Sequence, residues 1–274
     1  MYKLEKKWTT KTTTGILSKG IYFEGDTEIL VKGNSEPNNK EPFSEVIASN
    51  IAKALKLPHI SYQLKEASDF PDIKVFGSCT HVSICKKYDL PLYQFCNYME
   101  FKYNSSIRLS NFLTIYQNEG LSINFFIKLM VFDAFIGNQD RHINNIDFIR
   151  NLDGTISNAP ILDCGASLLY NVSENDLRIY DGSKLGPDKS KPLKDTHREQ
   201  IHLLERKFGI PKLFTLTSKE DFLDKVFKDS EEVFQHLSEK RVNAIKSYLN
   251  QRYDVYIHPY TIYKDSIKSN SLQW

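Results

Sequence analysis

In the first ninety residues, apolar and polar positions form short alternating runs, which is the pattern of β-strands. Four such runs predict strands, at residues 21–23, 28–32, 59–64 and 80–85. The turn-forming triplet Glu24-Gly25-Asp26 lies between the first two runs and predicts a β-hairpin there. The chain is therefore expected to begin with a small antiparallel sheet.

One helix is predicted within this strand-rich part, at residues 45–55. Isoleucine and leucine recur every four residues along it and form one apolar stripe. Pro42 near its start and Pro58 after its end bracket the segment, since proline is tolerated in a first turn but not in a helix interior.

From about residue 92 the pattern becomes mainly helical. The most apolar helix is predicted at residues 122–136, which are apolar nearly all round. It is short for a membrane span, which takes roughly 20 residues, and it carries Lys128 and Asp133. We therefore expect it to be the central buried helix of the larger part of the chain. Further amphipathic helices are predicted from about residue 196 onward.

A second hairpin is predicted directly after this helix. Residues 146–149 and 160–163 are short apolar runs, and the turn sequence at residues 151–154 lies between them. This hairpin would carry Asn145 at its start and Asp163 at its end, so that both could face one metal site.

The residues around this hairpin suit phosphoryl transfer from Mg-ATP. Asp140 is followed five residues later by Asn145, and Asp163 then lies in an apolar-Asp-x-Gly setting. The reaction needs one carboxylate near the acceptor hydroxyl, and an amide oxygen with a second carboxylate for Mg²⁺. Asp140, Asn145 and Asp163 are therefore the candidate catalytic residues, and Asn145 and Asp163 the candidate metal ligands. Each could singly be a solvated turn or a capping residue, but their joint spacing after a buried helix favours the site.

Candidate ATP-binding residues lie upstream. Lys32 ends an apolar strand and could pair with the nucleotide phosphates, and Glu45 could hold it in place. The alternatives are a solvated lysine at a strand end and an acidic residue that favours a helix N-terminus. The hydroxyl-rich segment with Gly15, Ser18 and Lys19 could cover the phosphates, or could be an ordinary polar hairpin.

Two further positions complete the predicted nucleotide site. Backbone groups near Ile84 and Lys86 would contact adenine if the connection between two lobes lies there. His142 is expected to support the site as a hydrogen-bond partner rather than as a base, because Asp140 already fills that role.

The bulk composition excludes several classes of protein. Lys and Arg number 36 and Asp and Glu 34, a net charge of +2 over 274 residues, so no nucleic-acid partner is expected. No stretch approaches the ~18 uninterrupted apolar residues of a membrane span. The first eight residues lack the apolar region of a signal peptide, so a cytoplasmic location is expected, while delivery to another cell as an effector stays open.

The cysteines add no metal or disulfide framework. Four cysteines are too few and too unevenly spaced for a disulfide scaffold, so reduced thiols are expected. Cys79, His81 and Cys85 lie close together, but no second ligand pair follows at structural-zinc spacing.

Residues 137–148 and 159–169, with the Asp140 and Asp163 motifs, resemble the HipA-like serine/threonine kinase family of bacteria. Residues 31–33 and 41–49 resemble its short, single-domain members, and the similarity covers roughly residues 10–250.

The resemblance implies an α+β, two-lobed protein-kinase-like fold, with a β-rich N-lobe and one helix in residues 1–88 and a mainly helical C-lobe in residues 89–274. It also implies ATP and Mg²⁺ as cofactors, a protein substrate, Asp140 as the catalytic aspartate and Lys32 as a phosphate ligand. Autophosphorylation is implied at a serine or threonine near the N-terminus, with Thr12, Thr13, Thr14 and Ser18 as candidates.

Departures from the family leave other functions open. The chain lacks the N-terminal subdomain of the long toxin members, so an antitoxin partner is compatible with the resemblance but not indicated. Cys164 stands where protein kinases usually have phenylalanine. The Asp-Arg-His-x-x-Asn and Asp-x-Gly pattern is also similar to phosphoinositide kinases, so a lipid or small-molecule kinase is one alternative. A catalytically silent nucleotide-binding module is another, although the lysine and metal positions are kept.

Overall fold

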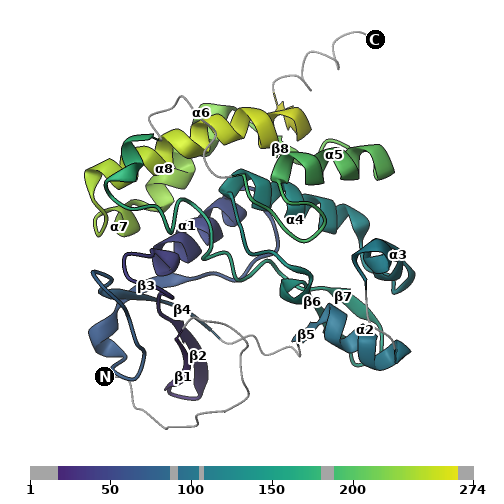
Figure 1. Ribbon diagram of the computed structural model, residues 1–274, viewed down its shortest axis with the longest axis horizontal. Coiled ribbons are helices and arrows are strands. Elements are labelled where there is room, and N and C mark those ends of the chain that lie inside the picture. The colour runs from purple at the N-terminus through teal and green to yellow at the C-terminus, as the bar shows by residue number, and fades with distance from the viewer. Residues whose placement is uncertain (1–17, 87–91, 105–107, 180–187, 265–274) are drawn as a thin grey trace.

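The computed structural model describes residues 18–86, 92–104, 108–179 and 188–264 (Figure 1). A four-stranded antiparallel sheet forms first, in the spatial order β1-β2-β4-β3. Its strands are β1 (Lys19–Glu24), β2 (Thr27–Lys32), β3 (Gln63–Glu66) and β4 (His81–Lys86). The predicted small N-terminal sheet is therefore confirmed.

The first hairpin has the predicted turn. Glu24 pairs with Thr27, which leaves Gly25 and Asp26 as a two-residue connection. Gly25 has φ +61°, a left-handed conformation that glycine adopts without steric cost.

The strand predicted at residues 59–64 begins later, at Gln63. The preceding residues leave the sheet and follow the segment near Ile161 instead. Ile60 N–H donates to the Ile161 carbonyl at 2.9 Å, and Ile161 N–H donates to the Pro58 carbonyl at 2.8 Å. Alternation in sequence alone could not separate a sheet strand from this extended connection.

Helix α1 (Glu41–Ala54) begins four residues earlier than predicted. Pro42 occupies its first turn, where a backbone N–H would have no partner within the helix. Eleven of its fourteen residues are buried, because the helix packs against β4 on one side and α6 (Lys219–Asp229) on another. The apolar stripe predicted burial of one helix face, whereas most of the helix is buried.

The remainder of the described chain is mainly helical. Its other helices are α2 (Phe95–Tyr103), α3 (Leu109–Asn118), α4 (Ile123–Ile136), α5 (His197–Phe208), α7 (Glu231–Phe234) and α8 (Glu239–Arg252). A π-helical turn, Tyr253–Ile257, extends α8. Four helices begin at a hydroxyl that accepts a hydrogen bond from the backbone three residues on; the capping residues are Ser122, Thr196, Ser218 and Ser238.

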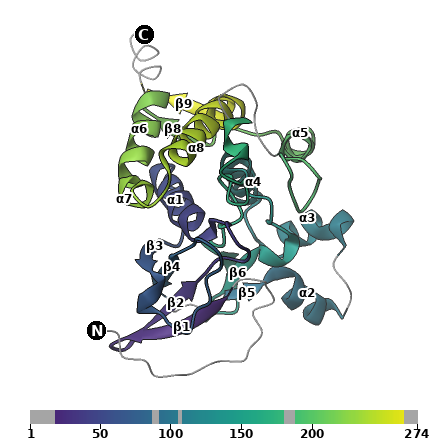
Figure 2. The same ribbon diagram turned by 60° about the vertical axis from the view of Figure 1, so that its left-hand side comes forward.

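Helix α4 is the predicted central helix. Figure 2 shows it with α1 and α8 on one side and α5 on the other. It is bounded by the Ser122 cap and by Gly137, whose φ is +67°. A Cβ at Gly137 would lie 1.8 Å from the Tyr248 hydroxyl, so only glycine fits where α4 meets the loop that follows.

The second hairpin differs from the prediction. A three-stranded antiparallel sheet joins β5 (Leu92–Gln94), β6 (Asp147–Arg150) and β7 (Ile156–Asn158). The second strand is thus β7, and residues 160–163 leave the sheet to pass beside residues 58–60. Residues 92–94, predicted as helical, pair with β6 as a strand.

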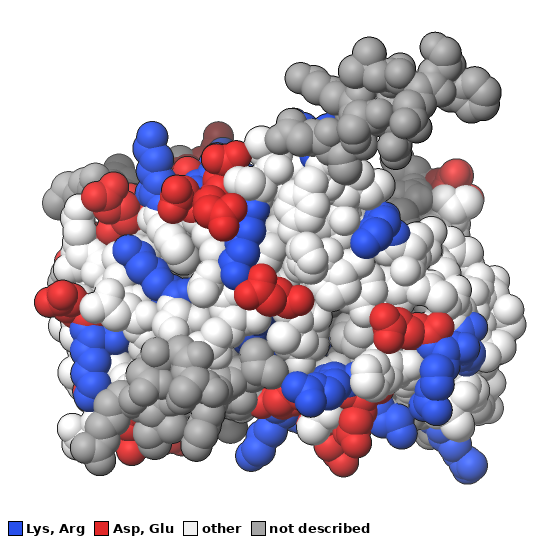
Figure 3. Space-filling model, turned by 90° about the horizontal axis from the view of Figure 1, so that it is seen from above, with Lys and Arg blue, Asp and Glu red and all other residues white. Residues whose placement is uncertain are grey.

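A last, two-stranded parallel sheet pairs β8 (Phe214–Leu216) with β9 (Thr261–Tyr263). The four cysteines are buried free thiols, as expected. Among the described residues, no helix combines the length and apolarity needed to cross a membrane. Figure 3 shows basic and acidic side chains intermixed on one face of the molecule. The division into two lobes stays a prediction, and its boundary at residues 88 and 89 lies outside the described residues.

Candidate active site

The first group of the site surrounds Lys32, the last residue of β2. Lys32 is 3% exposed, and its Nζ lies 2.9 Å from Asp163 Oδ1 and 3.5 Å from Glu45 Oε2. It also donates a hydrogen bond to the Tyr62 hydroxyl at 3.1 Å. A buried ammonium is therefore held by two carboxylates that come from α1 and from the segment after β7.

Lys32 and Asp163 each stabilise the charged form of the other. Burial alone would lower the pKa of Lys32, but Asp163 and Glu45 outweigh it and raise that pKa well above its usual value. In turn Lys32 holds the pKa of Asp163 well below its usual range, with a further contribution from Lys19. The lysine and Asp163 are thus both charged at neutral pH.

Glu45 also fixes the segment that carries Asp163. Its Oε1 accepts a hydrogen bond from Cys164 N–H at 2.9 Å. Gly165 lies so close to α1 that a Cβ there would be 3.0 Å from Glu45 Oε2. Asp163 itself has φ +59°, an uncommon conformation for a residue other than glycine. The Asp-Cys-Gly turn is therefore shaped by its contact with α1.

The second group is built on Asp133, a fully buried residue of α4. Its carboxylate accepts hydrogen bonds from Arg141, with Nε to Oδ2 at 2.9 Å and Nη2 to Oδ1 at 3.3 Å. Arg141 is 2% exposed. Burial would lower the pKa of Arg141, but the Asp133 carboxylate outweighs this effect and raises it. The two-point contact is the strong geometry for a carboxylate and a guanidinium.

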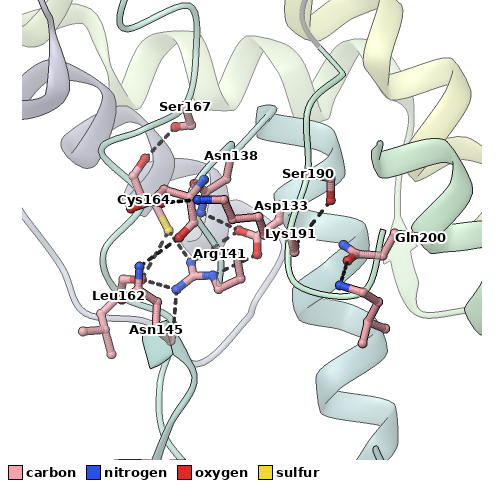
Figure 4. A network of polar contacts seen from close by, with 12 residues as sticks. Asp133, Asn138, Arg141, Asn145, Leu162, Cys164, Ser167, Ser190, Lys191 and Gln200 are labelled. Carbon is pink, nitrogen blue, oxygen red and sulfur yellow. Dashed lines mark hydrogen bonds and ion pairs between the residues drawn. The ribbon is translucent and has the colours of Figure 1, made fainter. Parts of the chain in front are cut away.

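Arg141 ties the two candidate loops together (Figure 4). Its Nη1 donates to the Asn145 carbonyl at 3.2 Å and to the Leu162 carbonyl at 2.9 Å, and its Nη2 contacts Cys164 Sγ at 3.2 Å. One buried side chain thus holds the backbone before Asp163 beside the backbone at Asn145.

Asp140 is presented to solvent by this buried framework. Asn138 donates to Asp133 Oδ1 at 3.0 Å, and its own side-chain oxygen accepts from Asp140 N–H at 3.1 Å. Asn145 Nδ2 donates to the Asp140 carbonyl at 2.8 Å. The Asp140 side chain is 53% exposed, and Lys191 Nζ lies 3.1 Å from its Oδ1. A fixed backbone therefore carries an accessible carboxylate with one lysine beside it.

Lys191 reaches Asp140 from a distant segment that is anchored at Asp188. Asp188 Oδ1 accepts hydrogen bonds from the Tyr256 hydroxyl at 2.8 Å and from Arg252 Nη2 at 3.3 Å. A bridge between Lys189 and Thr196 closes the segment just before α5. The position of Lys191 thus depends on packing against the C-terminal part of the described chain.

His142 lies within electrostatic range of both groups. Burial lowers the pKa of its imidazole, while the carboxylates of Asp140 and Asp163 act in the opposite direction. The ring is therefore mostly neutral at pH 7, which suits a hydrogen-bonding partner.

The other predicted residues fall in different places. Ser18 adjoins the site: its carbonyl accepts from Gly33 N–H at 2.9 Å, and its hydroxyl accepts from Lys74 N–H at 3.0 Å. Ile84 turns its side chain into a separate apolar cluster under the sheet, and Lys86 lies exposed at the end of β4. The remaining predicted positions, Thr12, Thr13, Thr14 and Gly15, lie outside the described residues.

Sequence reasoning missed the contributions of Tyr62, Asp133, Asn138 and Lys191. Asp133 left a signal, because an aspartate in an otherwise apolar buried helix needs a cationic partner, and Arg141 follows at a short distance. No feature of the sequence points to Tyr62 or Lys191, since each reaches the site only through long-range packing.

Comparisons with known proteins give a family match and a set of similar solved structures, two of which are described below. The family described as HipA-like C-terminal domain matches residues 6–236. The Helicobacter pylori proinflammatory kinase CtkA aligns with a TM-score of 0.58 and 18% identity over 94% of each chain, which shows a shared fold. HipA from Shewanella oneidensis MR-1, solved in a toxin–antitoxin complex with HipB and operator DNA, aligns at 12% identity over 98% of this chain and 70% of that chain. Its TM-score of 0.47 supports no conclusion. No curated protein sequence matches.

Proposed function

The chain belongs to the HipA-like C-terminal domain family, and we propose that it is an ATP- and Mg²⁺-dependent protein serine/threonine kinase. The fold shared with CtkA, which is described as a kinase, supports a kinase-type phosphotransferase. A small N-terminal sheet followed by a mainly helical remainder is consistent with a two-lobed arrangement that binds nucleotide between its parts.

The observation that carries the proposal is the ion-paired group around Lys32. Protein kinases need a strand lysine paired with a helix glutamate, and an aspartate of an Asp-x-Gly turn that binds metal. Here Lys32 contacts Glu45 of α1 at 3.5 Å and Asp163 at 2.9 Å. All three groups are in contact at once, so the lysine is held ready to neutralise phosphate charge.

Asn145 and Asp163 supply the types of oxygen atom that magnesium takes as ligands. Mg²⁺ prefers carboxylate and amide oxygens. The side-chain amide nitrogen of Asn145 donates a hydrogen bond to the Asp140 carbonyl. The amide oxygen of Asn145 therefore stays available as a metal ligand. Asp163 contacts Lys32 through Oδ1, so its other carboxylate oxygen, Oδ2, can bind a metal. Asn145 and Asp163 would hold the ion, which when bound neutralises charge on the nucleotide phosphates.

Asp140 is the proposed base. Its exposed carboxylate can accept the proton of an acceptor hydroxyl, and the hydrogen bonds from Asn138 and Asn145 fix the backbone beneath it. Lys191 Nζ, 3.1 Å from Asp140 Oδ1, offers a positive charge where phosphoryl charge moves during transfer. His142 supports the loop without acting as a base.

Autophosphorylation near the N-terminus is part of the proposal. Ser18 is a candidate because it adjoins Gly33, the residue after the phosphate-binding lysine. Thr12, Thr13 and Thr14 are the other candidates from the sequence.

The test separates nucleotide binding from transfer. Thermal stabilisation by ATP with Mg²⁺, and ATP turnover, are measured for the native chain, Asp163→Asn, Asp140→Ala and the surface control Asp224→Ala of α6. Asp163→Asn should lose both signals, while Asp140→Ala should keep the stabilisation and lose about 10²- to 10⁴-fold in turnover. The control should behave as the native chain. Full turnover by Asp140→Ala would disprove the assigned role of this loop.

A further inference from the structure

Three potential metal ligands meet on the side of the N-terminal sheet that faces α7. Glu66 ends β3, His81 begins β4, and His236 follows α7; one ligand atom from each lies within 4.8 Å of the others. The two imidazole rings are 4.3 Å apart between centroids. Figures 1 and 2 both show α7 beside the β3–β4 edge. Residues more than 150 positions apart in the chain thus converge at one point.

His81 provides an independent sign of a ligand. The residue is only 6% exposed, and among the described residues its Nε2 has no hydrogen-bond partner. Glu66 Oε1 lies 3.2 Å away, a distance at which it would form an ion pair with a protonated imidazole. A buried polar atom without a partner is costly, and a bound ion is one of the few features that explain it.

The other ring nitrogen of His81 favours the correct tautomer. Nδ1 lies 2.8 Å from Thr80 Oγ1 and can donate its proton there. Nε2 then keeps its lone pair on the side of Glu66 and His236. Metal-binding histidines are commonly oriented in this way by a hydrogen bond at the second nitrogen.

We propose that Glu66, His81 and His236 bind a divalent transition-metal ion of the zinc type, with water as the fourth ligand. Bonds of about 2.0–2.2 Å in a tetrahedron place ligand atoms roughly 3.3–3.6 Å apart. The Glu66–His81 distance of 3.2 Å already matches this spacing, and the exposed side chains of Glu66 and His236 can rotate to close the rest. Imidazole and carboxylate together suit zinc.

The positive charge of Lys40 does not block the site. Lys40 contributes to the lowered pKa of His81, after burial and His236, so its charge also opposes a cation. Its ammonium is bonded to Ser78 Oγ at 3.3 Å. One carboxylate and two neutral imidazoles retain a net negative charge to offset it.

The ion would have a structural role. It would join the sheet that carries Lys32 to the connection between α7 and α8, and His81 also packs against Phe43 of α1 at 5.4 Å between ring centroids. None of its ligands belongs to the proposed catalytic group. The inference therefore stands or falls separately from the proposed kinase activity.

Zinc binding to the full chain, prepared without a histidine tag and dialysed against chelator, tests the proposal by calorimetry and by thermal unfolding. We expect one Zn²⁺ per chain and a melting temperature that rises with zinc concentration. Because both exposed ligands can be changed without opening the core, Glu66→Gln and His236→Ala are the informative variants, and each should weaken binding by at least about tenfold.

The control is His202→Ala, which removes an exposed histidine of α5 and should leave zinc affinity unchanged. With Co²⁺ in place of zinc, the native chain should show the visible absorption of a tetrahedral site, and His236→Ala should lose it. Equal zinc affinity in the native chain and in both ligand variants, or no binding by the native chain, would overturn the proposal.

Discussion

The two ion-paired groups of the site, around Lys32 and around Asp140, differ sharply in burial. Lys32 is enclosed by Asp163, Glu45 and Tyr62, and such a group is costly to break, because loss of one partner leaves an uncompensated buried charge. Asp140 and Lys191 are each about half exposed, so their contact contributes little to stability. The first group therefore fixes the site, whereas the second is free to act on a substrate.

Lys191→Ala tests this distinction. We expect turnover to fall by about tenfold or more, because a positive charge beside the transferred phosphoryl group is lost. Stabilisation by Mg-ATP and the melting temperature should stay the same. Lys189→Ala, an exposed lysine two residues away, is the control in parallel kinetic and thermal measurements. A large loss of nucleotide stabilisation in Lys191→Ala would show instead that this lysine belongs to the nucleotide-binding group.

At the level of elements, helix α4 leads directly into the Asp140 loop. Gly137, at the end of the helix, determines the direction in which the loop leaves it. The glycine has φ +67° and has no room for a Cβ, because the Tyr248 hydroxyl of α8 would lie 1.8 Å away. The end of α4 and the start of the loop are therefore coupled to the packing of α8.

Gly137→Ala should destabilise the protein by more than the roughly 1–3 kcal/mol of backbone strain alone, since Tyr248 must also move. Gly154→Ala is a matched control: it has φ +84° in the β6–β7 turn, with nothing within 4 Å of the added Cβ. Urea unfolding of both variants isolates the contribution of the contact. Equal destabilisation of the two would mean that the Tyr248 contact has no energetic weight.

The elements also show how far sequence patterns reach. Helix α4 was predictable because a long apolar run lies between a capping serine and a glycine, and the first hairpin because its turn residues are adjacent. The strand predicted at residues 59–64 and the second strand of the other hairpin were displaced, because residues 58–60 and 161 pair with each other across about 100 positions. The spacing of Asp140, Asn145 and Asp163 is local, whereas Lys191 reaches Asp140 only through the anchor at Asp188.

Across the whole molecule, α5 is joined to the C-terminal region through a buried histidine. His197 is fully buried near Tyr256. Burial, with repulsion from Arg252, lowers the pKa of His197 to about 3. The unfolded chain binds a proton there near pH 6.5, so between these values it holds more protons than the folded chain.

The free energy of unfolding should therefore fall as the pH drops below 6.5, with up to about 1.4 kcal/mol per pH unit from this histidine. His197→Phe should remove that part of the slope, and His202→Phe, exposed on the same helix, should keep it. Urea unfolding at several values between pH 7 and pH 4 provides the comparison. If the native chain and His197→Phe had the same slope, the buried imidazole would not be the titrating group.

The central claim is that this chain transfers phosphate from Mg-ATP with Asp140 as the base. The most direct measurement is the intact mass of the purified chain after incubation with Mg-ATP, beside Asp140→Ala treated identically. We expect the native chain alone to gain one or more phosphates, located by peptide mapping at Thr12, Thr13, Thr14 or Ser18. An equal gain by Asp140→Ala, or no gain by a native chain that binds Mg-ATP, would contradict the account.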